Sequence, residues 1–120
     1  MTRTGAIVFT WGAPVRGREM KGLEVFGEAL QYYEELSKEG RIIAHREYFN
    51  TAADGGMMII EGLLSELHLL VQDDEFLRLQ QRASAIVEDF RREVVAGGSD
   101  QTVQQLVTMY TESLADLGLA

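Results

Sequence analysis

The sequence predicts one α+β domain in which a strand, a helix, two strands, a helix and a strand follow one another, with a further helix at the end. Apolar runs rich in β-forming residues alternate with segments of helical periodicity. The length of 120 residues suits a single domain with its own core. No repeat, linker or low-complexity tract divides the chain. We therefore expect one domain over residues 1–120, with a core over 5–96 and a terminal helix over 99–118.

The first element is a strand and the second a long helix. Residues 5–11 (GAIVFTW) are apolar and contain several β-formers. Residues 18–39 carry apolar side chains at three- and four-residue spacing, and Gly40 is placed to end this helix. The apolar stripe consists of Leu23, Phe26, Ala29, Leu30, Tyr33 and Leu36.

Two strands joined by a turn come next. Residues 41–50 (RIIAHREYFN) predict a strand, and Asp54-Gly55 is the expected pivot of the turn. The following stretch, GGMMIIEG, is too short for an ordinary helix and lies between glycines, so it predicts a strand. It does not alternate apolar and polar residues, which indicates that both of its faces are covered.

The second half of the chain is mainly helical. Ser65 is a candidate cap for a short helix, and Asp73 or Asp74 for another through residues 75–83. Residues 84–95 (SAIVEDFRREVV) are ambiguous, and we interpret most of them as a strand. Gly97-Gly98 ends that strand, and Ser99 or Asp100 caps the most regular amphipathic helix of the chain. Its stripe consists of Val103, Leu106, Val107, Tyr110, Leu114 and Leu117.

This element order predicts a ferredoxin-like β-α-β-β-α-β fold with an antiparallel sheet and an extra C-terminal helix. The first and third strands are central in that topology and are apolar on both faces, whereas the second and fourth are charged, as edge strands often are. Helices cover only one face. A second copy of the sheet is the simplest cover for the other, so we expect a homodimer. The terminal helix, folded back over its own sheet, is the rival cover.

Composition excludes several classes of function. The net charge of −8 opposes binding to nucleic acid or to an anionic membrane. The chain has no cysteine, hence no disulfide or thiolate metal site. His45 and His68 are its two histidines and show no metal-ligand spacing. With no signal peptide or membrane span recognisable, we expect a cytoplasmic protein without metal or cofactor.

The order of elements and the apolar central strands resemble the dimeric α+β barrel superfamily over residues 5–95. Within it, the chain is most similar to YCII-related proteins. Shared features are Gly40, the turn at Asp54-Gly55, the strand end at Glu61-Gly62 and, in part, Asp74-Glu75-Phe76. The resemblance implies a homodimer of facing sheets. The chain departs from the family at the first helix, which has no histidine, and at Glu75, which replaces a proline, so the family's chemistry does not carry over.

His45 and Glu47 are the first candidate site residues. They lie two apart on one strand and therefore share a face. If that face lines the space between two facing sheets, with Phe9 and Trp11 nearby, the pair would form a polar corner of an aromatic pocket. A histidine beside a carboxylate can act as a general base or orient a ligand. The alternative is an edge-strand pair that faces water or a neighbouring strand.

Other candidates surround this pair. Arg46 and Tyr48 share the opposite face of the strand, and the sequence does not fix which face is inward. Glu61 ends an apolar strand and is either a partly buried acid with a raised pKa or the strand's solvated end. Arg16 and Arg18 precede a helix, where an anion would be attracted, although each is also an ordinary loop cation.

Two classes of function are consistent with these residues. In one, a small organic molecule binds between sheet and helices, with or without cofactor-independent catalysis by His45, Glu47 and Glu61. In the other, the protein is a non-catalytic interaction or assembly module whose sheet face is only an interface. A cavity of a few hundred Å³ would favour the first class.

Overall fold

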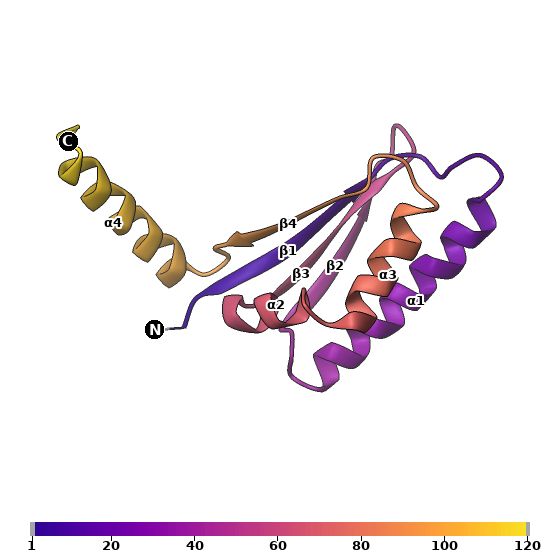
Figure 1. Cartoon of the computed structure of the whole chain (residues 1–120), viewed down its shortest axis with the longest axis horizontal. Helices are drawn as coiled ribbons and strands as arrows, with labels where there is room; N and C mark the ends of the chain where they lie inside the picture. Colours follow the sequence, from indigo (N-terminus) through magenta and orange to yellow (C-terminus); the bar gives the residue numbers. More distant parts are fainter. Residues whose placement is uncertain (1, 120) are drawn as a thin grey trace.

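The computed structural model describes residues 2–119 as a four-stranded antiparallel sheet with three helices on one face (Figure 1). The strands are β1 (Thr4–Trp11), β2 (Ala44–Phe49), β3 (Gly56–Leu63) and β4 (Arg91–Ala96). Their spatial order is β2-β3-β1-β4, with every neighbouring pair antiparallel. The prediction that the two apolar strands are central and the two charged strands are edges is confirmed.

The helices are α1 (Glu19–Lys38), α2 (Leu64–Leu70), α3 (Asp74–Ser84) and α4 (Asp100–Asp116). Two predicted caps are confirmed: Asp73 accepts a 3.2 Å hydrogen bond from the Glu75 N–H, and Ser99 one of 3.2 Å from the Thr102 N–H. The predicted cap at Ser65 is wrong. Helix α2 begins directly after β3, with Leu63 at the N-cap position, because the strand runs straight into the helix without a loop.

The last strand is shorter than predicted. Residues 84–90 are not part of β4, which begins at Arg91. Asp89 has a φ of 54°, in the left-handed region, and this conformation interrupts an extended chain. Apolar residues on both sides of Asp89 pack instead against the core, where Ile86 and Phe90 are partly buried. Backbone hydrogen bonds tie this segment to the loop after β1, including one of 2.7 Å from Gly12 N–H to the Glu88 carbonyl.

The two faces of the sheet have different surroundings. Ile7 and Phe9 of β1 and Met58 and Ile60 of β3 point toward α1, α2 and α3 and belong to the buried core. The alternate residues on the same strands point to the other face, called here the open face. It is formed by Ala6, Val8, Thr10, Met57, Ile59, Glu61 and Leu63 of the central strands and, from their pairing, by Arg46, Tyr48, Arg91, Glu93 and Val95 of the edge strands.

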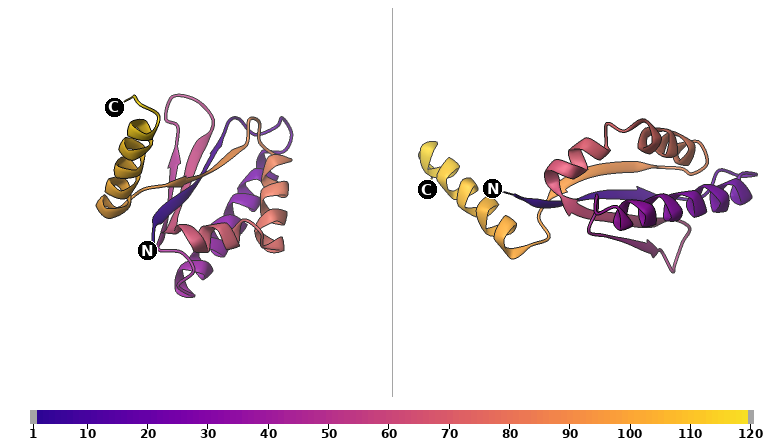
Figure 2. Two further views of the ribbon diagram at one scale, coloured as in Figure 1. Left: turned by 60° about the vertical axis from the view of Figure 1, so that its left-hand side comes forward. Right: turned by 90° about the horizontal axis from the view of Figure 1, so that it is seen from below.

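Helix α4 stands away from the other three helices in each view (Figures 1 and 2). Thr102 is its only residue in the buried class among those described. The Cα radius of gyration is 16.9 Å, whereas a compact domain of this length has about 14 Å. The terminal helix therefore does not fold back over its own sheet. None of the helices within residues 2–119 combines the length and apolar character needed to cross a membrane.

Candidate functional site

A cavity of about 340 Å³ lies between the sheet and helices α1 and α3. Its floor comes from the ends of β1 and β3, and the segment before β4 contributes Ile86, Val87 and Phe90. Leu23, which is 66% exposed, also lines it, so the cavity opens to the surface beside α1. This volume falls in the range of sites for small organic molecules.

The walls are mainly aromatic. Six aromatic side chains line the cavity, namely Phe9, Trp11, Phe26, Tyr33, Phe49 and Phe90. Phe9 and Phe90 stack with ring centroids 5.7 Å apart, and Phe26 and Phe49 meet edge to face at 5.3 Å. Such pairing holds ring orientations that are suited to contact with a flat apolar molecule.

Trp11 keeps its place in the wall because position 56 is glycine. A Cβ at Gly56 would lie 2.8 Å from Cζ2 of the Trp11 indole and 2.5 Å from the Tyr48 carbonyl oxygen. The indole therefore passes over the backbone of β3 at a distance that any side chain would prevent. Gly56, which begins the MMII strand, therefore leaves room for the Trp11 indole in the cavity wall.

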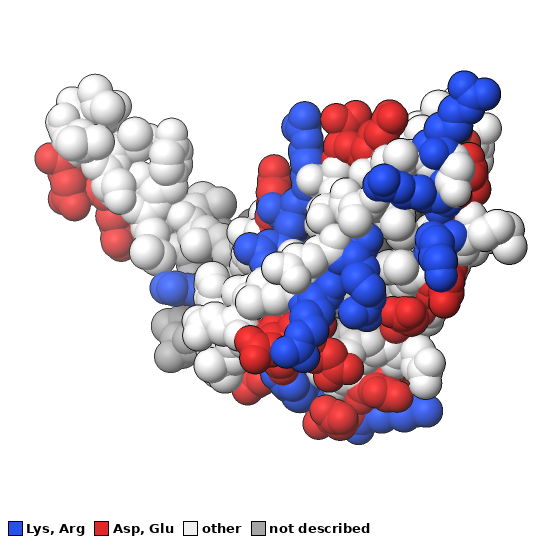
Figure 3. Space-filling view, turned by 45° about the vertical axis from the view of Figure 1, so that its right-hand side comes forward, with Lys and Arg blue, Asp and Glu red and all other residues white. Residues whose placement is uncertain are grey.

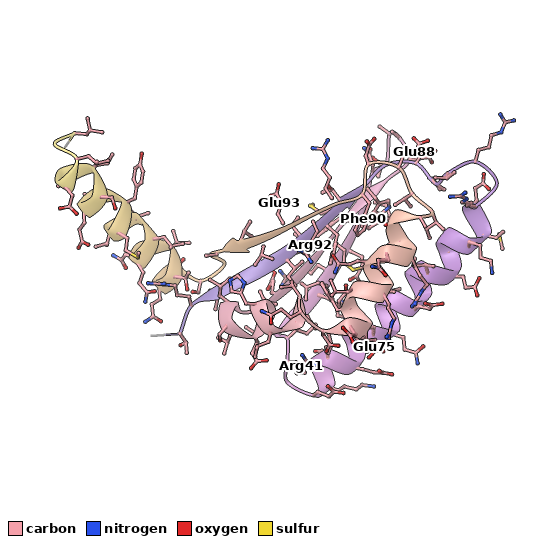
Figure 4. All side chains as sticks on the ribbon, viewed as in Figure 1. Arg41, Glu75, Glu88, Phe90, Arg92 and Glu93 are labelled. Atoms are coloured by element: carbon pink, nitrogen blue, oxygen red, sulfur yellow. The ribbon has the colours of Figure 1, made fainter. Side chains whose placement is uncertain are left out.

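Gln80 of α3 provides a buried hydrogen-bond donor at the cavity. Its Oε1 accepts a 3.2 Å hydrogen bond from Nη1 of Arg92, which fixes the orientation of the amide. Its Nε2 is buried and donates to no group among the described residues. A buried donor without a partner is costly, so this nitrogen is a candidate contact for a ligand acceptor. Arg92 lies on the helix side of β4, and Glu93 projects from the opposite side (Figure 4).

Three titratable groups line the cavity: Glu19, Tyr33 and Asp54. The backbone N–H of Gly17 donates to Glu19 Oε1 at 3.0 Å and lowers the pKa of this carboxyl. Burial raises the pKa of Tyr33, with a smaller contribution from Tyr32, so its hydroxyl stays protonated at neutral pH. Glu19 and Asp54 are exposed.

The structure brings His45 and Glu47 together but places neither in the cavity lining. His45 Nδ1 lies 2.6 Å from Glu47 Oε2, and Nε2 lies 3.0 Å from Glu34 Oε2 on α1. Burial lowers the pKa of His45, but the hydrogen bonds to Glu47 and Glu34 outweigh it and raise the pKa above 6.5. With a carboxylate on each nitrogen, the imidazolium ties β2 to α1. Both residues lie on the helix side of the sheet, not on the open face.

The remaining predicted residues divide between two regions. Phe9 and Trp11 line the cavity between the sheet and the helices. Glu61 pairs with Arg46 across the open face at 2.5 Å, and Tyr48, on the same face, is 48% exposed. Arg16 and Arg18 are exposed before α1, and Arg18 Nη1 donates to the Ala85 carbonyl.

Sequence reasoning missed several residues of the cavity. Phe49 and Phe26 were within predicted elements, and the aromatic content of those elements was the available signal. Gln80 had no signal, because its donor matters only once Arg92 fixes the amide from another strand. Phe90 was hidden in the segment interpreted as a strand.

Comparison of the chain with models of protein families, with curated proteins and with solved structures found no match in any of the three. No group of three or more His, Asp or Glu side chains within residues 2–119 is arranged to hold a metal ion. The cavity and its walls are thus the features from which a function is inferred.

Proposed function

We propose that this protein binds a small, flat, largely apolar molecule in the cavity between the sheet and helices α1 and α3. The observation that carries the proposal is an aromatic cavity of about 340 Å³ with a buried donor, Gln80 Nε2, that has no partner within the described chain. Apolar walls with few fixed polar groups are typical of binding sites for organic molecules.

The polar groups define the kind of ligand. Gln80 Nε2 requires an acceptor, such as a carbonyl oxygen, on the ligand. Glu19 and Asp54 line the cavity and are acidic, which disfavours an anionic ligand. Binding is favoured over catalysis because neither His45 nor His68 lines the cavity. A neutral aromatic molecule with one carbonyl group fits these requirements.

We also infer that the fold is ferredoxin-like and that two copies join through their open faces, as in a dimeric α+β barrel. Leu63, Val95 and Tyr48 on this face are 37%, 41% and 48% exposed in the single chain. Together with Val8, Met57 and Ile59 on the central strands they give this face an apolar centre between charged positions, which favours association. The cavity lies on the other side of the sheet, so ligand binding and self-assembly are compatible. The sequence alone suggests them as two alternative functions.

Two probe molecules of similar size test the cavity and its donor separately. Coumarin is flat, apolar and carries a carbonyl acceptor, whereas naphthalene lacks the acceptor. Both should raise the unfolding temperature and change the emission of Trp11, the single tryptophan of the chain. Coumarin should bind more tightly, and Gln80→Leu should remove that preference, which corresponds to roughly five- to tenfold in affinity.

A matched pair of glycines on α1 provides the control. Gly22 lines the cavity, whereas a Cβ at Gly27 would meet nothing within 4 Å. Gly22→Leu should abolish binding of both probes, and Gly27→Leu should leave it unchanged. Equal binding by the two variants would contradict the cavity proposal. An unchanged preference for coumarin in Gln80→Leu would contradict the role of Gln80 alone.

A further inference from the structure

Helix α4 presents an apolar stripe that its own chain does not cover. Val103, Val107, Tyr110 and Leu117 are 48%, 58%, 66% and 71% exposed, and Leu114 lies between them on the same side. Their spacing alternates between four and three residues, which places them in one line along the helix, as in a helix that packs against a partner. The sequence therefore specifies a contact surface that the single protomer leaves empty.

The direction of α4 is held by a polar cluster at its first turn. Thr102 is 1% exposed, and its Oγ1 accepts a 3.0 Å hydrogen bond from the Thr4 N–H of β1. Thr4 Oγ1 donates to the Gly97 carbonyl at 2.7 Å and lies 2.9 Å from Ser99 Oγ. Gly97 and Gly98 have φ of 146° and 89°, which sets the sharp turn out of β4. Covering its own sheet would require α4 to give up these bonds.

Helix α4 and the open face border the same space. Helix α4 rises from the end of the sheet on the side away from α1 and α3, which is the side of the open face (Figures 1 and 2). The helix and the open face therefore form the arms of an angle, and each carries apolar side chains that are exposed or partly exposed in the single chain. A body that fills this angle must contact both of them.

A second copy of the chain has the surface needed to fill it. Burial of a large apolar side chain removes roughly 60–120 Å² from water. The four exposed residues of the stripe and Val95 of the open face therefore provide roughly 300–600 Å², to which the partly exposed Val8, Met57 and Ile59 add. This sum approaches the roughly 800 Å² that each partner contributes to a stable interface. Each protomer of a twofold pair both offers and receives the same two surfaces.

Helix α4 is acidic, and the open face carries an arginine without an ion-pair partner among the described residues. Helix α4 carries Asp100, Glu112 and Asp116 and neither Lys nor Arg, and Figure 3 shows it as a projection without cationic side chains along its length. On the open face, Arg91 is exposed and forms no ion pair with any residue between 2 and 119. The open face also carries the exposed acid Glu93. A helix crossing from one protomer with a carboxylate beside Arg91 of the other would form a favourable charge pair.

We propose that α4 is an exchanged arm: in the homodimer inferred above, the stripe of each α4 packs against the second copy and completes the cover of its open face. The inference rests on the proposed dimer but adds a separate requirement, namely that the stripe is part of the interface. Its residues lie outside the cavity, so changes there leave the binding site intact.

Sedimentation of the full chain and three variants tests the arm. Wild type should sediment as a dimer at micromolar concentration. Val107→Glu with Tyr110→Glu should weaken dimerisation at least tenfold, because it places charges within the stripe. Gln101→Glu with Thr108→Glu adds the same charges at exposed positions of α4 away from the stripe and should leave the dimer unchanged. Ile59→Glu should dissociate the dimer through the open face.

The outcomes separate the two proposals. A monomeric wild type overturns both the dimer and the arm. A monomeric Ile59→Glu variant together with a dimeric Val107→Glu, Tyr110→Glu variant overturns the arm alone. Circular dichroism and unchanged Trp11 emission show that the variants remain folded, since the stripe is exposed in the protomer.

Fluorescent labels on introduced cysteines show whether α4 packs against the partner protomer or against the sheet of its own chain. The chain contains no cysteine, so Thr111→Cys on α4 and Thr10→Cys on the open face accept single labels. Energy transfer should appear when the two single-label variants are mixed and allowed to exchange subunits. Transfer that occurs only within a doubly labelled chain diluted in unlabelled protein would contradict exchange and show that α4 covers its own sheet.

Discussion

The two faces of the central strands differ, although neighbouring residues build them. Ile60 is fully buried beneath the helices, whereas Ile59, one residue earlier, is only partly covered. On the helix side, aromatic residues leave a cavity within an otherwise filled core; on the open side, aliphatic residues form a surface without a cover. The non-alternating MMII run therefore borders the cavity on the helix side and forms part of the open face on the other.

The largest expected effect on stability comes from replacing Ile60 and Ile59 with alanine in separate variants. Ile60→Ala should lower the free energy of unfolding by about 2–5 kcal/mol, because it removes buried contacts and leaves a void. Ile59→Ala should cost less than about 1.5 kcal/mol at low protein concentration and more as the dimer forms. Urea unfolding at two protein concentrations measures both. If both variants lost the same unfolding free energy at both protein concentrations, the two faces would not differ in burial or in association.

A smaller effect is expected at Gly56 on the helix side, where the Trp11 indole lies close to the backbone of β3. Gly56→Ala should destabilise the protein by about 1–3 kcal/mol, because the new methyl group overlaps the Trp11 indole and the Tyr48 carbonyl. The emission of Trp11 should shift as the ring is displaced. Thermal unfolding and fluorescence of the same sample provide the measurement, and an alanine variant with wild-type emission would contradict the proposed contact.

A still smaller effect is expected from His45, the polar corner of the helix side. Its folded-state pKa is raised above 6.5, so its stabilising contribution is complete below pH 6.5 and fades as the pH rises through the folded value. His45→Gln should therefore cost on the order of 1 kcal/mol at pH 6 and less at pH 9. Urea unfolding at both values tests this, with His68→Gln, an exposed position on α2, as the control. If the loss of stability in His45→Gln were larger at pH 9 than at pH 6, the pKa of His45 would not be raised in the folded protein.

The smallest effect concerns the exposed side of α1. Gly27 has ordinary helical backbone and open space around it. Gly27→Ala should raise the free energy of unfolding by about 0.5–1 kcal/mol, because alanine loses less backbone freedom on folding. Thermal unfolding measures the gain, and a loss would show that α1 has an unrecognised neighbour at this position.

Local patterns predicted the elements well where one residue type decided the structure. Gly40 follows α1 with a φ of 74°, and Ser99 caps α4, both as expected from the sequence. The central strands were recognisable because they are apolar on both faces. The segment before β4 was not, since the left-handed conformation of Asp89 depends on contacts made by its neighbours.

The site was harder to predict because it depends on contacts between distant elements. The sequence placed Phe9 and Trp11 in a pocket, but it did not reveal that Glu34 on α1 would hold the second nitrogen of His45. Similarly, Gln80 is an ordinary helix residue until Arg92 on β4 orients its amide. Side-chain roles of this kind follow from the packing of α1 and α3 on the sheet.

The strand order also has a consequence for the time course of folding. β2 and β3 are joined by a short turn and can pair early, whereas the pairing of β1 with β4 brings together distant residues such as Gly5 and Ala96. The cavity is bounded by β1 and by the segment that leads into β4, so it is complete only when the most distant partners have met. A molecule bound there would act on contacts formed last. We expect it to slow unfolding while leaving the rate of folding nearly unchanged.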